Sequence, residues 1–201
     1  MDVSGSVENH WEDEKRFVMD LVRKFDLSPN GAHAAVTTFS STASLAIKFS
    51  AHTTTHDFEV ALGNLPSPSG GTEIGKALDV ALNEMLQEVN GMRLDSPKVV
   101  VLITDGNSGS EVDYAGYRNS FQGAHIKFLV VGVGSVNKND LLELVETPED
   151  LVMVNDFAAL DATNFVEHTT FCEPDTCACK YNLNHRIWQC KNVPQYSSEI
   201  I

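Results

Sequence analysis

The stretch Asp2-Val3-Ser4-Gly5-Ser6 places one carboxylate and two hydroxyl groups within a single short loop. Two distant stretches carry matching oxygen groups: Gly70-Gly71-Thr72 precedes a long amphipathic segment, and Thr104-Asp105-Gly106 follows a strongly apolar one. Hydroxyl and carboxylate oxygens, with no thiol or imidazole among them, suit a hard divalent cation such as Mg²⁺ or Mn²⁺ better than they suit zinc. The three stretches therefore predict one metal site assembled from three loops.

The spacing of apolar residues predicts a chain in which helices and strands alternate. Helices are expected over residues 12–25, 57–62, 73–89, 112–121, 141–145 and 157–168, and strands over 34–39, 45–49, 98–104, 126–131 and 151–154. The segment 98–104 has no polar alternation, which is typical of a parallel strand covered on both faces. Asp105 follows it at the carboxyl end, where open α/β sheets place their ligand sites. The pattern predicts a doubly wound α/β fold, with a mostly parallel sheet flanked by helices and one antiparallel hairpin strand.

Thr72 has two interpretations. It stands at the cap position of the helix expected over residues 73–89, where a threonine hydroxyl commonly accepts a hydrogen bond from the first turn. A plain cap would not need the paired glycines Gly70 and Gly71 before it. We therefore favour Thr72 as a metal ligand.

Together the three stretches resemble the metal-ion-dependent adhesion site of the von Willebrand factor A domain, and the resemblance covers residues 2 to about 169. It implies that Ser4 and Ser6 are direct hydroxyl ligands and that Thr72 is a third, switchable hydroxyl ligand. It implies that Asp2 and Asp105 hold the ion directly or through water. In that family an acidic side chain of the partner protein takes the last ligand position, so the resemblance implies adhesion or matrix binding and not catalysis.

The resemblance also implies a kind of partner. We expect an extracellular protein that offers an acidic side chain, such as collagen or another matrix protein, and loop residues Asn107, Ser108 and Glu111 to set specificity. The net charge of −14 argues against nucleic acid or an anionic membrane as partner. No apolar run approaches the roughly 18 residues of a membrane span.

Catalytic motifs are weak or absent in the sequence. Gly132-Val133-Gly134 follows a strand but lacks the third glycine of a dinucleotide loop, and no Gly-x-Ser-x-Gly elbow occurs. We expect a protein that is not an enzyme. Two alternatives stay open: a structural matrix module that self-associates without metal, and an intracellular subunit of an enzyme complex.

The C-terminal residues 171–201 differ in composition from residues 1–170, which we assign to the A domain. All the cysteines lie in this extension, which is either a tail or the start of a following module: Cys172, Cys177, Cys179 and Cys190. A segment this short cannot bury a core of its own, so disulfides are the natural way to order it, and they favour secretion. Zinc is the second interpretation, although Cys177 and Cys179 have one spacer residue between them. Three pairings are open, and the resemblance implies that Cys172 bridges to a cysteine upstream of the first strand.

The resemblance further implies that a central strand precedes the loop that starts at Asp2, whereas only Met1 precedes it here. We therefore expect the first central strand to be missing, the chain to be a fragment of a longer secreted protein, and any signal peptide to be lost with that strand. Such a strand would bury several large apolar side chains, each worth about 1.5–3 kcal/mol. The chain alone should then be poorly stable, unless another segment fills the central slot.

Overall fold

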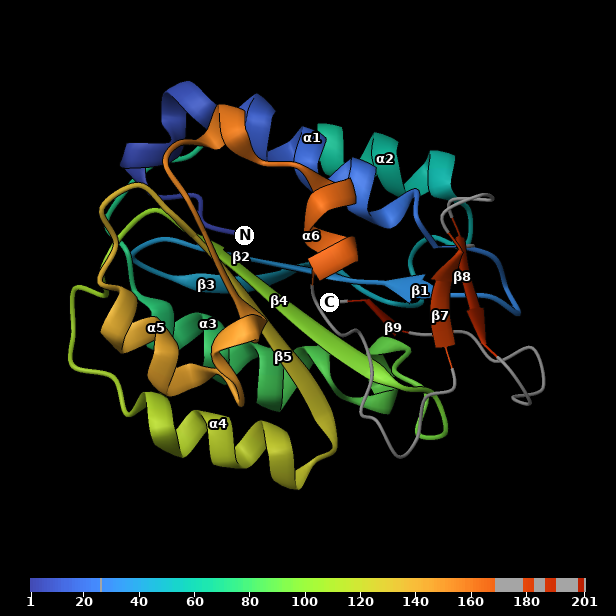
Figure 1. Ribbon diagram of the computed structural model, residues 1–201. Coiled ribbons are helices and arrows are strands. Elements are labelled where there is room, and N and C mark those ends of the chain that lie inside the picture. Colours follow the sequence, from blue (N-terminus) through green and yellow to red (C-terminus); the bar gives the residue numbers. More distant parts are fainter. Residues whose placement is uncertain (26, 169–178, 183–186, 191–198, 201) are drawn as a thin grey trace.

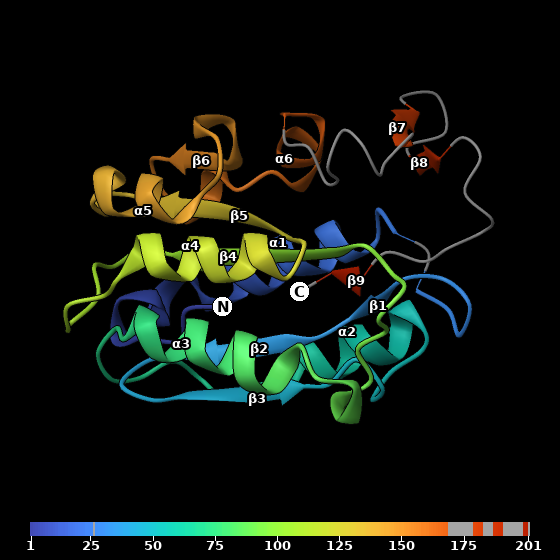
Figure 2. The same ribbon diagram turned by 90° about the horizontal axis from the view of Figure 1, so that it is seen from below.

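The computed structural model describes residues 1–25, 27–168, 179–182, 187–190 and 199–200. A sheet lies in the middle of the molecule and helices cover both of its faces (Figures 1 and 2). The sequence predicted a doubly wound α/β fold with a mostly parallel sheet, and the structure confirms this architecture.

The main sheet has the strand order β1-β9-β4-β5-β6, and all of its neighbouring strands run parallel. Its strands are β1 (His33–Ala34), β9 (Glu199–Ile200), β4 (Lys98–Thr104), β5 (Ile126–Val133) and β6 (Leu151–Val154). One residue after β1, the chain continues as β2 (Val36–Phe39), which pairs antiparallel with β3 (Ala43–Ile47). This pair is the hairpin expected from the sequence. A separate antiparallel pair joins β7 (Cys179–Asn182) and β8 (Ile187–Cys190).

Helices α1, α2 and α6 pack on one face of the sheet, and α3, α4 and α5 pack on the other (Figure 1). Their bounds are α1 (Trp11–Val22), α2 (Thr55–Gly63), α3 (Ile74–Val80), α4 (Tyr114–Gly123), α5 (Lys138–Leu144) and α6 (Ala162–His168). A 3-10 segment, η1 (Gly5–His10), leads into α1, and a π-helical segment, η2 (Ala81–Met85), continues α3. Two apolar cores result, one on each side of the sheet.

The helix expected over residues 73–89 is shorter than its apolar periodicity suggested. The α-helical part begins at Ile74, the π-helical segment ends at Met85, and a separate 3-10 turn, η3 (Glu88–Asn90), follows. A π-helical turn contains an extra residue, which shifts the phase of the buried face. Val89, which extends the apolar stripe in the sequence, is consequently 85% exposed.

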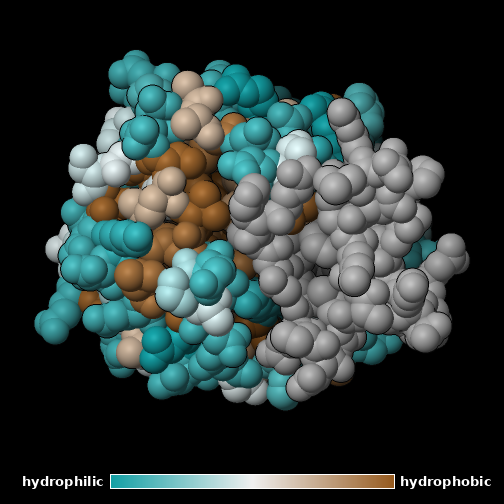
Figure 3. Space-filling model, viewed as in Figure 1, coloured by the Kyte–Doolittle hydropathy of each residue, from teal (hydrophilic) through white to brown (hydrophobic). Residues whose placement is uncertain are grey.

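The edge strand β6 is partly open to solvent. Leu151 is buried, whereas the three residues that follow it are only half-buried. Apolar residues gather on this side of the molecule and are surrounded by polar ones (Figure 3). In the part of the chain that the structure describes, no helix has the length and apolar character needed to cross a membrane.

The place of the central strand is filled from two sides. Asp2 forms an isolated parallel bridge with Phe39 of β2, so the chain reaches the sheet before it enters the loop of residues 2–6. The C-terminal strand β9 lies further along the same slot, between β1 and β4. No strand precedes the loop of residues 2–6 among the described residues, as the sequence predicted, and these two short segments lie in its place.

Candidate metal centre

Three loops meet at the carboxyl end of β4, and backbone hydrogen bonds tie them together. Gly5 N donates to Gly70 O (2.9 Å), which joins the first loop to the glycine pair before α3. Gly109 N donates to Thr72 O (2.7 Å), which joins that same segment to the loop after β4. Because both bonds involve main-chain atoms, the approach of the loops does not depend on the conformation of any flexible side chain.

Hydroxyl and carboxylate oxygens form a continuous chain across the first and third loops. Ser4 N donates to Asp2 Oδ1 (2.9 Å), the hydroxyl oxygens of Ser4 and Ser6 lie 3.0 Å apart, and Ser6 Oγ donates to Asp105 Oδ1 (2.8 Å). The other carboxylate oxygen of Asp2 accepts from Thr104 Oγ1 (2.7 Å). Residues more than a hundred positions apart in the sequence are thus within hydrogen-bond distance of one another.

Thr72 joins this cluster through its contact with Gly106. A Cβ atom added to Gly106 would lie 2.9 Å from Thr72 Oγ1, so the threonine hydroxyl sits directly against the residue that follows Asp105. The N-cap of α3 is Glu73, which makes no side-chain capping bond, and Thr72 lies one residue earlier. Thr72 therefore does not act as the helix cap, and its hydroxyl lies against the loop that carries Asp105.

The cluster runs from the protein interior to the surface. Asp2 and Ser4 are 0% and 2% exposed, Thr72 and Asp105 are half-buried, and Ser6 is exposed. Burial raises the pKa of Asp105 above its ordinary value, and the hydrogen bond from Ser6 opposes that shift. A cation at this place would favour the charged carboxylates, because its positive charge stabilises them where burial has removed the solvating water.

Glu14 of α1 supports the first loop through a hydrogen bond, a role that was not predicted from the sequence. It is fully buried, and its Oε1 atom accepts from Asp2 N (3.1 Å). Burial raises the pKa of Glu14 well above its ordinary value, and the neighbouring ammonium of Met1 opposes that shift. The sequence did carry a signal for this residue: Glu14 lies three positions after Trp11 and four before Val18, on the apolar face of α1.

Thr104 and Glu73 are two further residues whose roles the sequence did not reveal. Thr104 is completely buried, and its single hydroxyl donates to Asp2 and accepts from Gly106 N (3.3 Å). Glu73 Oε2 accepts from Ser110 Oγ (2.5 Å), which fixes the loop after β4 beside Thr72. Both residues hold the loops that carry the predicted ligands.

The residues expected to set specificity differ in their accessibility. Asn107 is exposed, and its Oδ1 atom accepts from Asn137 N (2.7 Å), which ties it to the loop after β5. Glu111 is exposed. The Ser108 hydroxyl is buried and has no hydrogen-bond partner among the described residues. Asn107 and Glu111 are thus better placed than Ser108 to touch a ligand.

The donor set fits a hard cation. It consists of two carboxylates and three hydroxyls, which are the oxygen ligands that Mg²⁺ and Mn²⁺ prefer. Within the described ranges, no three His, Cys, Asp or Glu side chains come together in a way that could hold a metal ion. The cluster around Asp2 thus differs from a zinc site of thiols and imidazoles, since its ligands are mainly hydroxyls.

A family model described as the von Willebrand factor type A domain matches residues 1–167. The chain belongs to this family. Curated relatives of this A domain include the collagen alpha-1(XII) chain of Notophthalmus viridescens, which is 30% identical over 78% of the chain, and human matrilin-3, which is 27% identical over 81%. The alignments cover 17% and 34% of those two proteins, so the chain spans a minor part of the relatives' length.

Solved structures share the fold of this A domain at low sequence identity. Proximal thread matrix protein 1 from the mussel byssus has a TM-score of 0.78 at 22% identity, over 84% of this chain and 45% of that one. A further structure of the same protein, described with a zinc-occupied MIDAS motif, has a TM-score of 0.78 at 21% identity, over 90% and 48% of the two chains. The manganese-loaded TRAP protein of Plasmodium vivax has a TM-score of 0.65 at 19% identity, over 79% and 66%.

Proposed function

We propose that this A domain binds a protein ligand outside the cell, through a divalent cation held by the cluster around Asp2. The observation that carries the proposal is the chain of contacts from buried Asp2 through Ser4 and Ser6 to Asp105, which ends at the protein surface. The collagen and matrilin relatives, which are proteins of the extracellular matrix, support an adhesion or matrix role. Two structural neighbours, one with a zinc-occupied MIDAS motif and one loaded with manganese, support a divalent ion.

The residues would hold Mg²⁺ or Mn²⁺ through the hydroxyls of Ser4, Ser6 and Thr72 and the carboxylates of Asp2 and Asp105. The ion supplies electrostatic attraction for an anionic oxygen. Two carboxylates balance the double positive charge without exceeding it. An acidic side chain of the partner can therefore still bind the ion as a further oxygen ligand. Binding of this kind requires no nucleophile and no proton transfer, and we accordingly assign the site to recognition and not to catalysis.

Partner choice would come from the loops around the ion. Asn107 and Glu111 are the exposed residues of the loop after β4 and are the candidates for direct contact. Because the chain carries a net charge of −14, a partner surface that surrounds its acidic side chain with basic residues would fit best. Collagen or another matrix protein is the class of partner we propose.

Calorimetric titration with Mn²⁺ tests the metal site. We expect a dissociation constant between about 1 µM and 1 mM, like the weaker oxygen sites of extracellular modules. Asp105→Ala should abolish the binding, because it removes one of the two carboxylates. Asp95→Ala is the matched control, since Asp95 is exposed and lies outside the cluster. Equal Mn²⁺ affinity in Asp105→Ala and the control would refute the assignment.

Ligand binding is tested separately with immobilised collagens and matrilins in the presence of Mg²⁺ or of excess EDTA. Binding should be lost in EDTA. Thr72→Ala should weaken it while the thermal unfolding of the domain stays unchanged, because Thr72 neither caps α3 nor belongs to the buried core. Binding that survives EDTA would instead favour the metal-independent structural module.

A further inference from the structure

The strand β6 forms an outer edge of the main sheet. It pairs in parallel with β5, and no other described strand pairs with it. Figure 2 shows β6 on the outer side of β5. The pairing with β5 continues from Leu151 to Val154 without a bulge. A regular edge strand of this kind presents unpaired main-chain groups to its surroundings.

The main-chain groups of Met153 face away from β5. Val154 O accepts from Gly134 N (2.9 Å), so the groups of Val154 are directed toward the β5 side. Successive residues of a strand direct these groups to opposite sides, so those of Met153 and the carbonyl of Leu151 point out of the sheet. Leu151 N donates to Pro148 O and not to β5, in agreement with this alternation. Met153 N, Met153 O and Leu151 O are thus directed toward the place of a further strand.

The side chains of β6 are apolar on both faces of the sheet and are incompletely covered. Val152 and Val154 pack against the core on the side of α1 and α6, and Met153 packs against the core on the other side. All three are half-buried, and apolar residues are visible on this side of the molecule in Figure 3. The outer strand of the hairpin, β3, differs, since its exposed residues are the small Ser44 and Ala46. β6 therefore leaves larger apolar side chains open at an edge.

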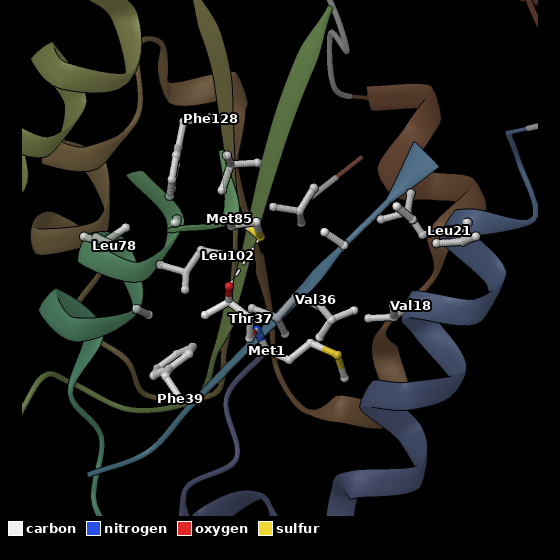
Figure 4. Close-up of a pocket in the computed structure, with 18 of the residues that line it drawn as sticks. Met1, Val18, Leu21, Val36, Thr37, Phe39, Leu78, Met85, Leu102 and Phe128 are labelled. Atoms are coloured by element: carbon white, nitrogen blue, oxygen red, sulfur yellow. Dashed lines mark hydrogen bonds between the residues drawn. The ribbon is translucent and has the colours of Figure 1, made fainter. Parts of the chain in front are cut away.

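Apolar residues of β2 and β4 are fully covered, in contrast to those of β6. Val36 of β2 and Leu102 of β4 are 4% and 5% exposed. Figure 4 shows these residues with Val18 of α1 on one side and Leu78 of α3 on the other. The cavity that remains there has a volume of about 70 Å³, well below the roughly 300 Å³ of the smallest typical ligand pockets. That cavity is too small for a peptide segment, whereas the edge of β6 is open to one.

Exposed acidic residues lie at both ends of this edge. Glu149 precedes β6 and Asp156 follows it, and both are exposed. Asp150 is buried and paired with Lys127 (2.8 Å), so its charge is balanced within the domain. Residues 139–167, which include most of α5 and all of β6, contain no lysine or arginine. A segment that binds here should therefore carry basic residues at its ends.

A second copy of the chain would fit this edge poorly. If β6 paired antiparallel with β6 of another copy, the residues before the strand in one copy would lie beside the residues after the strand in the other. Glu149 would then come close to Asp156 of the other copy, and like charges across a strand pair are destabilising. The net charge of −14 adds to the repulsion between copies. The same acidic residues would attract a basic segment.

We propose that the edge of β6 is a second binding surface, at which an extended apolar segment of a partner protein, flanked by basic residues, adds one strand to the sheet. Main-chain hydrogen bonds to Met153 and Leu151 supply affinity, and the half-buried side chains of β6 select apolar residues on both faces of the added strand. The surface includes none of the residues of the candidate metal centre. Binding at β6 therefore requires no metal ion.

Residue-resolved amide hydrogen exchange in EDTA tests the proposal with a synthetic peptide. The probe is a blocked peptide of sequence Val-Val-Thr-Val-Val with two lysines added at each end. At millimolar concentration it should slow exchange of the Met153 amide at least tenfold, because this amide gains an acceptor. A peptide with glutamates in place of the lysines should slow it less than threefold, because Glu149 and Asp156 repel it. An unprotected Met153 amide, or equal protection by both peptides, would overturn the proposal.

Met153→Pro tests whether the main chain of β6 makes the contact. Proline is tolerated in an edge strand where its position needs no ladder amide, so the variant should keep its Tm within a few degrees and lose the peptide. Met153→Leu is the matched control, since it keeps the amide and an apolar side chain and should bind the labelled peptide within threefold of the unaltered chain. Equal binding by the two variants in fluorescence anisotropy would contradict strand addition.

Two further measurements use the unaltered chain. The same peptide, N-methylated throughout its apolar part, cannot donate main-chain hydrogen bonds and should bind at least tenfold more weakly; equal binding would contradict strand addition. Sedimentation of the chain alone at micromolar concentration should show a monomer. A dimer that disappears in Met153→Pro would identify a second copy as the occupant of the edge and would overturn the assignment to a basic partner segment.

Discussion

The hydrogen bond from Thr104 to Asp2 should be one of the strongest contacts that hold the candidate metal centre. Both residues are 0% exposed, and Thr104 Oγ1 donates to the carboxylate at 2.7 Å. Thr104→Val keeps the shape of the side chain but removes the donor. A buried hydrogen bond to a charged acceptor contributes about 1.5–3 kcal/mol. We therefore expect Thr104→Val to lower the free energy of unfolding by about 2 kcal/mol.

Thermal and urea unfolding in EDTA measure this loss without any contribution from bound metal. For a chain of this size, 2 kcal/mol corresponds to a fall in Tm of about 4–8 °C. Thr37→Val is the matched control, because Thr37 is also buried but its hydroxyl donates to the sulfur of Met85, a weak acceptor (3.3 Å). The control should lose less than about 1 kcal/mol. Equal losses in the two variants would show that the Asp2 carboxylate does not depend on Thr104.

Two other predictions follow from the structure. Gly106→Ala should weaken Mn²⁺ binding in calorimetry at least threefold, because the added Cβ would lie 2.9 Å from Thr72 Oγ1. The Tm should stay within a few degrees, because the backbone of Gly106 does not require a glycine. Unchanged affinity would place Thr72 away from the ion. Cys179 and Cys190 are directly opposed in the antiparallel pair of β7 and β8, at a separation that disulfides accept. Peptide mapping of protein secreted from an oxidising compartment should therefore find Cys179 linked to Cys190, and recovery of either as a free thiol would refute this pairing.

The three loops of the proposed metal site could be located from the sequence because each is a local feature. Asp2, Thr72 and Asp105 lie at the boundaries of elements that apolar periodicity reveals, and β4 begins and ends where the sequence indicated. The chemistry of a hydroxyl and carboxylate cluster can be recognised from residue types alone. The expectation that those residues meet followed from the geometry of parallel sheets, and the structure brings them together.

The supporting residues were harder to predict because their roles depend on tertiary contacts. Glu14 follows two other acidic residues at the start of α1, and such runs commonly serve the helix dipole on an exposed face. Its burial beneath Asp2 is decided by the packing of α1 on the sheet. The position of β9 could not be predicted either, because a two-residue strand at the end of a long extension has no periodicity to identify it.

Only part of the predicted cysteine extension lies among the residues that the structure describes. Cys172 and Cys177 lie outside the described residues, and so does most of the segment 171–201. The register of β7 and β8 favours one of the three pairings that the sequence left open, namely the one that joins Cys179 to Cys190. Pairing of the other two cysteines with each other, or of Cys172 with a cysteine upstream, stays a prediction.

Asp2 is the residue where the sheet and the candidate metal centre meet. Its amide donates to Glu14 of α1, its carboxylate accepts from Ser4 N and from Thr104 of β4, and it is the bridge partner of Phe39 in β2. Because these contacts come from four different parts of the fold, a shift of α1, β2 or β4 moves the carboxylate. Metal affinity should accordingly fall when a substitution displaces α1, β2 or β4, whereas a change in α4, which makes no hydrogen bond to Asp2 or to these partners among the described residues, should leave it unaltered.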